Sequence, residues 1–146
     1  MSNITLVQAE NLADAALAAG HAASLAPLTV VVLDSGGHVV VIKREDKSGI
    51  GRVEIATGKA WGSLGMGIGS RNLAARAAKT PQFVAALAVA FDGRMLPVPG
   101  GVLIRDGAGD IIGAVGISGD VSDQDEHCAI AGIKAVGLTA DPGVDA

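Results

Sequence analysis

The chain has 146 residues, a length that suits one domain with a continuous core, so we take residues 1–146 as a single domain. Its net charge of -4 at pH 7, with 15 acidic residues interspersed among 11 basic ones, leaves no basic stripe for a nucleic-acid backbone and excludes nucleic acid as a partner. The hydrophobic fraction is 49%, yet the longest apolar run, residues 83–91, is about half as long as a bilayer-spanning helix; we therefore expect no membrane partner and place the apolar surplus in a core or a subunit interface.

The first half of the chain predicts a helix followed by a hairpin. Thr5-Leu-Val-Gln8 is a capping-box pattern, and apolar residues recur behind it at the helical period, which predicts a helix over about residues 5–25. Two β-branched runs follow, residues 28–34 and 38–43, joined by a short turn rich in glycine. They predict a tight antiparallel hairpin.

The second half predicts helices, another hairpin and a last helix. Residues 53–90 are rich in alanine with helical spacing and glycine breaks, which indicates two or three helices. Residues 101–105 and 111–118 form a second hairpin around an Asp-Gly turn. Ser122-Asp-Gln-Asp125 resembles a capping box that opens a final helix, which Gly137 closes. Two hairpins with helices around them predict an α+β fold, an antiparallel sheet covered by helices.

The best spaced polar set lies at the start of the middle helices. Arg52 could clamp a carboxylate through two hydrogen bonds, while Glu54 or Lys59 transfers a proton. The equally weighted alternative is a row of solvated surface charges.

A second candidate region follows the middle helices. Pro99 stands before Gly100 and Gly101 at a strand start, where flexible backbone could present amide donors to an anion or could simply bend. Asp125 and Glu126 lie in the first turn of the last helix, where carboxylates favour the helix dipole. Capping and a site role are compatible there.

The histidines and the cysteine give no metal-site spacing. His21, His38 and His127 are isolated, and Cys128 has no Cys-x-x-Cys partner, so we expect no dedicated metal site. Cys128 is either a small buried hydrophobe, which we favour, or a nucleophile with a lowered pKa. A single cysteine cannot form an internal disulfide, which agrees with a reducing compartment, and we expect a cytoplasmic protein.

Six segments in the same order resemble the haem-binding HbpS/GlcG-like family, which is also found as the C-terminal part of PduO-type corrinoid proteins. They are Leu33-Asp-Ser-Gly-Gly-His-Val39, Lys43-Arg-Glu-Asp46, Ala56-Thr-Gly-Lys-Ala60, Pro99-Gly-Gly-Val102, Gly113-Ala-Val-Gly-Ile-Ser-Gly119 and Gln124-Asp-Glu126. The resemblance implies a profilin-like layered fold with a five-stranded antiparallel sheet. It also implies homo-oligomers built from dimers, often octamers, and makes haem or corrinoid a possible ligand.

Our leading hypothesis from the sequence is a homo-oligomeric catabolic enzyme that needs no cofactor and acts on a small carboxylate or oxo acid. Glu54 would be the acid or base and Lys59 its electrostatic partner, while the amides of Gly100 and Gly101 would stabilise an enolate or oxyanion. The predicted substrate-binding residues are Arg52, Pro99, Gly100, Gly101, Asp125 and Glu126.

Two alternatives stay open at this point. The first is a non-catalytic haem or corrinoid carrier, with His21, His38 or His127 as the candidate axial ligand. The second is a structural assembly module, which would use the apolar surplus for subunit contacts and need no polar pocket.

Overall fold

The computed structural model describes residues 3–145 and contains helices and strands in the predicted order. The helices are α1 (Leu6–Ala22), α2 (Arg52–Met66), α3 (Ser70–Lys79), α4 (Pro81–Ala90) and α5 (Ser122–Ala135). The strands are β1 (Thr29–Asp34), β2 (Val39–Arg44), β3 (Gly101–Arg105), β4 (Ile111–Ser118) and β5 (Thr139–Asp141).

The five strands form one open antiparallel sheet in the order β2-β1-β4-β3-β5. The two predicted hairpins, β1 with β2 and β3 with β4, meet where β1 pairs with β4. The short strand β5 extends the β3 edge, from Leu103 opposite Asp141 to Arg105 opposite Thr139. The α+β prediction is confirmed, with an edge strand that the sequence pattern did not signal.

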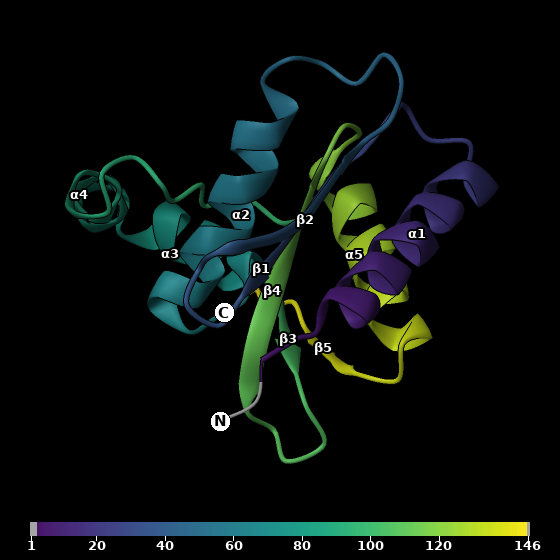
Figure 1. Ribbon diagram of the computed structural model, residues 1–146. Coiled ribbons are helices and arrows are strands. Elements are labelled where there is room, and N and C mark those ends of the chain that lie inside the picture. Colours follow the sequence, from purple (N-terminus) through teal and green to yellow (C-terminus); the bar gives the residue numbers. More distant parts are fainter. Residues whose placement is uncertain (1–2, 146) are drawn as a thin grey trace.

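Helices cover both faces of the sheet (Figure 1). Helices α1 and α5 pack together on one face, and α2 packs on β4, β3 and β1 from the other. Alternate residues of β1 therefore enter different cores: Val30 faces α1 and α5, whereas Val31 faces α2. Gly116 lets α2 lie directly on the sheet, because a Cβ atom there would collide with the carbonyl oxygen of Ala56.

The two predicted capping boxes turn out differently. At α1 the Gln8 amide donates to Thr5 Oγ1 at 3.1 Å and the Thr5 amide donates to Gln8 Oε1 at 3.0 Å, as predicted. At α5 the prediction is wrong: Val121 is the N-cap residue and no side chain caps the helix. Asp125 instead accepts a hydrogen bond from the Asp120 amide at 3.0 Å and faces α2.

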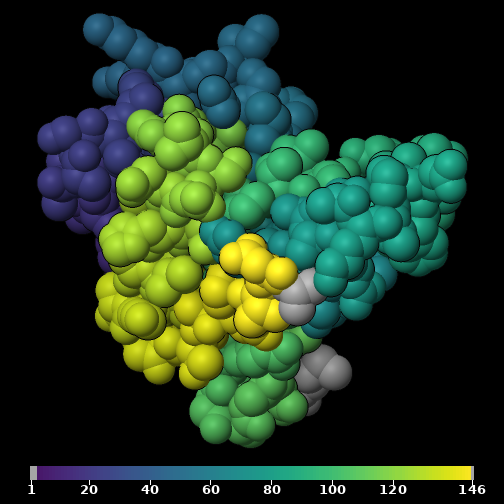
Figure 2. All heavy atoms as spheres, turned by 180° about the vertical axis from the view of Figure 1, so that it is seen from behind, coloured from purple at the N-terminus to yellow at the C-terminus, as the bar shows by residue number. Residues whose placement is uncertain are grey.

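Large apolar side chains are exposed at several places, among them the edge strand β2 and helix α4. On the edge strand β2, the side chains of Val39 and Ile42 are 55% and 42% exposed. Helix α4 packs on α3 and stands out from the body as part of an arm, visible in Figures 1 and 2. None of the helices within residues 3–145 is long and apolar enough to cross a membrane.

Candidate functional site

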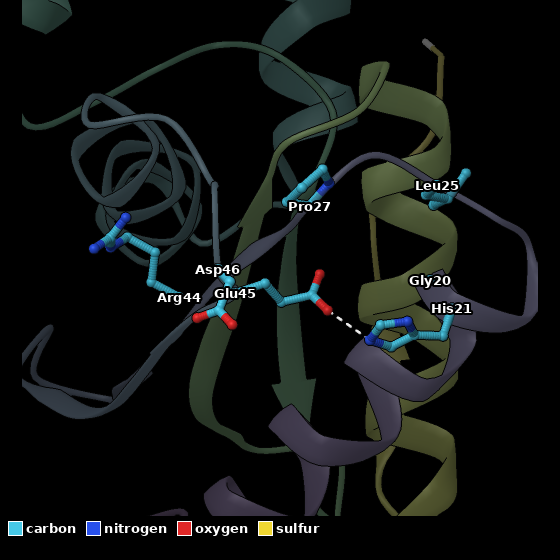
Figure 3. Close-up of a pocket in the computed structure, with 7 residues that line it drawn as sticks. All are labelled: Gly20, His21, Leu25, Pro27, Arg44, Glu45 and Asp46. Carbon is cyan, nitrogen blue, oxygen red and sulfur yellow. Dashed lines mark ion pairs between the residues drawn. The ribbon is translucent and has the colours of Figure 1, made fainter.

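A cavity of about 470 Å³ lies between the end of α1, the segment that leads into β1, and the end of β2 (Figure 3). Its lining residues are Gly20, His21, Leu25, Pro27, Arg44, Glu45 and Asp46. Two stretches of the chain, residues 20–27 and 44–46, thus meet around one histidine. The volume lies within the range of about 300–1,000 Å³ that small-molecule sites occupy.

His21 and Glu45 point toward one another across this cavity (Figure 3). His21 Nε2 lies 2.6 Å from Glu45 Oε2, and Glu45 Oε1 accepts a hydrogen bond from the Leu28 amide at 2.7 Å. The carboxylate is only 18% exposed and is held by the Leu28 amide just before β1, whereas the imidazole is 75% exposed. Glu45 therefore holds the His21 ring by one nitrogen and leaves Nδ1 without a partner among residues 3–145.

The rest of the lining is partly apolar and partly charged. Leu25 and Pro27 supply apolar surface, while Asp46 adds a second carboxylate. Arg44 is the one cation among the lining residues other than histidine, and its Nη1 donates to the carbonyl oxygen of Ser48 at 2.9 Å. In Figure 3 its guanidinium points away from His21.

Helix α2 brings Arg52 and Lys59 to the same side, because seven residues make nearly two full turns. Lys59 is 2% exposed; its Nζ donates to the carbonyl oxygen of Ile117 at 2.9 Å and lies 3.1 Å from Asp125 Oδ2. Arg52 Nη1 donates to Ser118 Oγ at 3.0 Å. This cluster joins α2 to α5 at the end of β4, and within it the Lys59 ammonium is occupied by Asp125 and the Ile117 carbonyl oxygen.

Burial dominates the titration of this pair. It lowers the pKa of Lys59, against the charge of Asp125, and raises the pKa of Asp125, against the charge of Lys59. Arg52 is close enough to lower the pKa of Lys59 further.

Glu54 does not join Arg52 and Lys59. It lies two residues after Arg52, which is about 200° around the helix, and its side chain is exposed. It lines another cavity, of about 390 Å³, together with Val39, Ile42 and Arg94, among others. The helical period alone accounts for this separation.

The other predicted substrate-binding residues are engaged within the fold. The Gly101 amide donates to Ser70 Oγ at 2.7 Å, so it is not free for an oxyanion. Gly100 has φ +118° and lies against Lys59, while Pro99 is half-buried before it. Glu126 Oε2 accepts from Arg71 Nε at 3.0 Å.

Arg71 gathers three carboxylates around this position. Besides Glu126, it lies 2.6 Å from Asp123 and 2.8 Å from Asp145 near the end of the described chain. These hydrogen bonds raise the pKa of Arg71. Glu126 therefore belongs to an ionic cluster that ties α3, α5 and the C-terminal segment together.

Comparison with known proteins identifies the family. Residues 4–134 match the family model HbpS-like, described as haem degrading protein HbpS-like. The chain belongs to the HbpS-like family. No curated protein sequence matches this HbpS-like chain.

Solved structures share the HbpS-like fold. A double mutant of HbpS from Streptomyces reticuli is 27% identical, with a TM-score of 0.79 over 92% of this chain and 87% of that one. The protein ORFY from Klebsiella pneumoniae is 25% identical, with a TM-score of 0.84 over 94% of this chain and 92% of that one. A haem complex of PduOC is 24% identical, with a TM-score of 0.83 over 93% and 96%, which shows the fold alone.

Of the three histidines in this HbpS-like chain, the structure places His21 at a described cavity. His38 Nδ1 lies 3.3 Å from Asp34 Oδ1 at the β1–β2 turn, and His127 is exposed on α5. Glu45 escaped the sequence analysis because it lies 24 residues from His21. Its local signals were its place two residues after a predicted strand and within the segment Lys43-Arg-Glu-Asp46 that resembles the family.

Proposed function

We propose that this HbpS-like chain binds haem at the cavity between α1 and β2, with His21 as the axial ligand. The observation that carries the proposal is a histidine at the edge of a cavity of about 470 Å³, oriented by Glu45, whose other ring nitrogen has no partner in the described part of the chain. Histidines that bind a metal almost always give their second nitrogen to a carboxylate, a carbonyl or a water, which fixes the ring.

The lining residues fit a tetrapyrrole in three respects. His21 would hold the iron and Glu45 would orient its imidazole. Leu25 and Pro27 would cover apolar macrocycle. Arg44 could reach a propionate only by exchanging its hydrogen bond with the Ser48 carbonyl oxygen and turning toward the cavity. When bound, haem would supply an iron centre for ligand binding or redox chemistry, tuned by the axial ligand and its surroundings.

Binding is better supported by the geometry than acid-base catalysis at Glu54 and Lys59. Lys59 and Asp125 are buried against each other, Glu54 faces another direction, and the Gly101 amide is occupied by Ser70. Neither Lys59 nor Arg52 lines any of the three described cavities. The catalytic roles of Glu54 and Lys59 stay predictions.

A haemin titration followed in the Soret band tests the proposal. We expect His21→Ala to weaken binding by about tenfold or more and to change the position of the band, because an axial ligand is lost. His38→Ala is the matched control, since His38 is also exposed and also lies against a carboxylate. Unaltered haemin affinity and spectrum in His21→Ala would overturn the proposal.

A further inference from the structure

Helix α2 does not cover the whole of its face of the sheet. It packs on β4, β3 and β1, and the edge strand β2 lies beyond β1. Ile42 of β2 pairs with Val31 and Val39 pairs with Leu33. Paired residues share a face of the sheet, and Val31 and Leu33 belong to the core under α2. Two exposed apolar side chains of β2 therefore line the strip beside α2.

This strip forms one wall of the cavity of about 390 Å³ that lies between β2, the first turns of α2 and the turn after α4. Its apolar wall consists of Val39, Ile42 and Val53. The Thr57 hydroxyl is already engaged, because it donates to the carbonyl oxygen of Val53 at 2.6 Å. The side-chain groups left to meet a polar ligand are the charges of Glu54 and Arg94. The volume suits a small molecule.

The fold holds Arg94 in one orientation at this cavity. Its guanidinium stacks on the ring of Trp61 at 4.6 Å from the centroid, and its Nε donates to the carbonyl oxygen of Phe91 at 3.0 Å. The Leu96 amide donates to the carbonyl oxygen of Gly58 at 3.1 Å, which ties this segment to α2. Within residues 3–145 the guanidinium has no ion-pair partner. A stacked guanidinium whose two terminal nitrogens are unpaired suits a carboxylate.

Glu54 supplies the opposite charge at the same cavity. In the described part of the chain its carboxylate has no ion-pair partner, and it is not paired with Arg94. Two opposite charges that line one cavity without neutralising each other complement a molecule that carries both signs. Because the remaining side chains of the wall are largely apolar, the same molecule should also have an apolar body.

We propose that this cavity binds a free α-amino acid with an apolar side chain. The carboxylate of the ligand lies on the terminal nitrogens of Arg94, its ammonium group on Glu54, and its side chain against Val39 and Ile42. A ligand with a single charge would leave Arg94 or Glu54 without a partner. The site is on the face of the sheet opposite α1 (Figure 1) and shares no lining residue with the cavity at His21, so it does not depend on haem.

The first test compares L-leucine with two analogues that each lack one charge. Trp61 is the only tryptophan and lies against Arg94, so its fluorescence reports on the site, and calorimetry gives the affinity. We expect L-leucine to bind with a dissociation constant of about 1 mM or below. 4-Methylpentanoate, without the amine, and 3-methylbutylamine, without the carboxylate, should each bind at least about fivefold more weakly. Equal binding of either analogue, or no calorimetric binding of leucine or phenylalanine up to about 20 mM, would overturn the proposal.

The second test assigns each charge of the ligand to its residue by calorimetry. Arg94→Gln and Glu54→Gln should each weaken leucine binding at least about fivefold. In Glu54→Gln, leucine and 4-methylpentanoate should bind equally, whereas in Arg94→Gln the preference for leucine should persist. Arg76→Gln and Glu10→Gln, which remove exposed charges on α3 and α1, are the matched controls and should bind leucine like the wild type. Far-UV circular dichroism checks that all variants are folded. A preference for leucine that survives Glu54→Gln would overturn the proposal.

Discussion

Replacing Lys59 by methionine should destabilise the protein strongly, because it leaves a buried carboxylate without its cation. Asp125 is 1% exposed, and in the wild type its Oδ2 faces Lys59 Nζ at 3.1 Å while its Oδ1 accepts from the Asp120 amide. Methionine has a similar volume, so the change removes charge rather than packing. Breaking a buried ion pair from one side costs about 3–5 kcal/mol, and we expect a loss in that range near neutral pH.

The loss should depend on pH. Burial raises the pKa of Asp125 above its unfolded value of 3.8, and the charge of Lys59 works against that rise. Without Lys59 the folded-state pKa rises further, so the folded protein binds more protons than the unfolded chain at pH values between the two. Stability of the variant relative to wild type therefore falls as pH increases through this window, and the deficit should be smaller at about pH 4.5 than at about pH 7.

Urea unfolding followed by circular dichroism measures this effect at fixed protein concentration, because association would shift the transition. Asp125→Asn and the double variant complete a mutant cycle, in which the double variant should lose less than the sum of the single losses. Lys134→Met, at an exposed lysine of α5, is the control. A loss below about 1 kcal/mol in Lys59→Met, or an equal deficit at both pH values, would refute the reasoning.

Two further predictions concern close packing and burial. Gly116→Ala should lower the free energy of unfolding by about 3 kcal/mol or more, because its Cβ would meet the backbone of α2. Gly107→Ala is the control, since Gly107 has open space around it, and should change this free energy by less than about 0.5 kcal/mol. Chemical unfolding compares the two variants, and equal stabilities would contradict the close approach of α2 to the sheet. Burial raises the pKa of the Cys128 thiol to about 11. Iodoacetamide at about pH 8 should therefore leave Cys128 unlabelled in the native protein and label it in urea. Labelling of the folded protein would contradict the burial of this thiol.

The regular elements could be predicted because their signals are local. The β-branched runs, the Asp-Gly turn and the box formed by Thr5 and Gln8 each lie within a few residues, and the structure contains both hairpins and the capped helix. Strand β5 has no such signal: its three residues extend the edge at β3 through backbone pairing rather than through a hydrophobic pattern.

The site depends on contacts that no local pattern contains. Asp125 lies in a first helical turn and was expected to cap it, but its partner Lys59 is 66 residues away. The cavity at His21 needs the end of β2 to return beside α1, which only the pairing of the sheet provides. The separation of Glu54 from Lys59, by contrast, follows from five residues of helix, about 140°, and was open to prediction.

A crystal structure of the protein grown with haemin tests the proposed function most directly. We predict iron bonded to a ring nitrogen of His21, with Glu45 on the other nitrogen and the macrocycle against Leu25 and Pro27. Iron bonded to His38 or His127, or haem packed at a site without His21, would contradict the proposal.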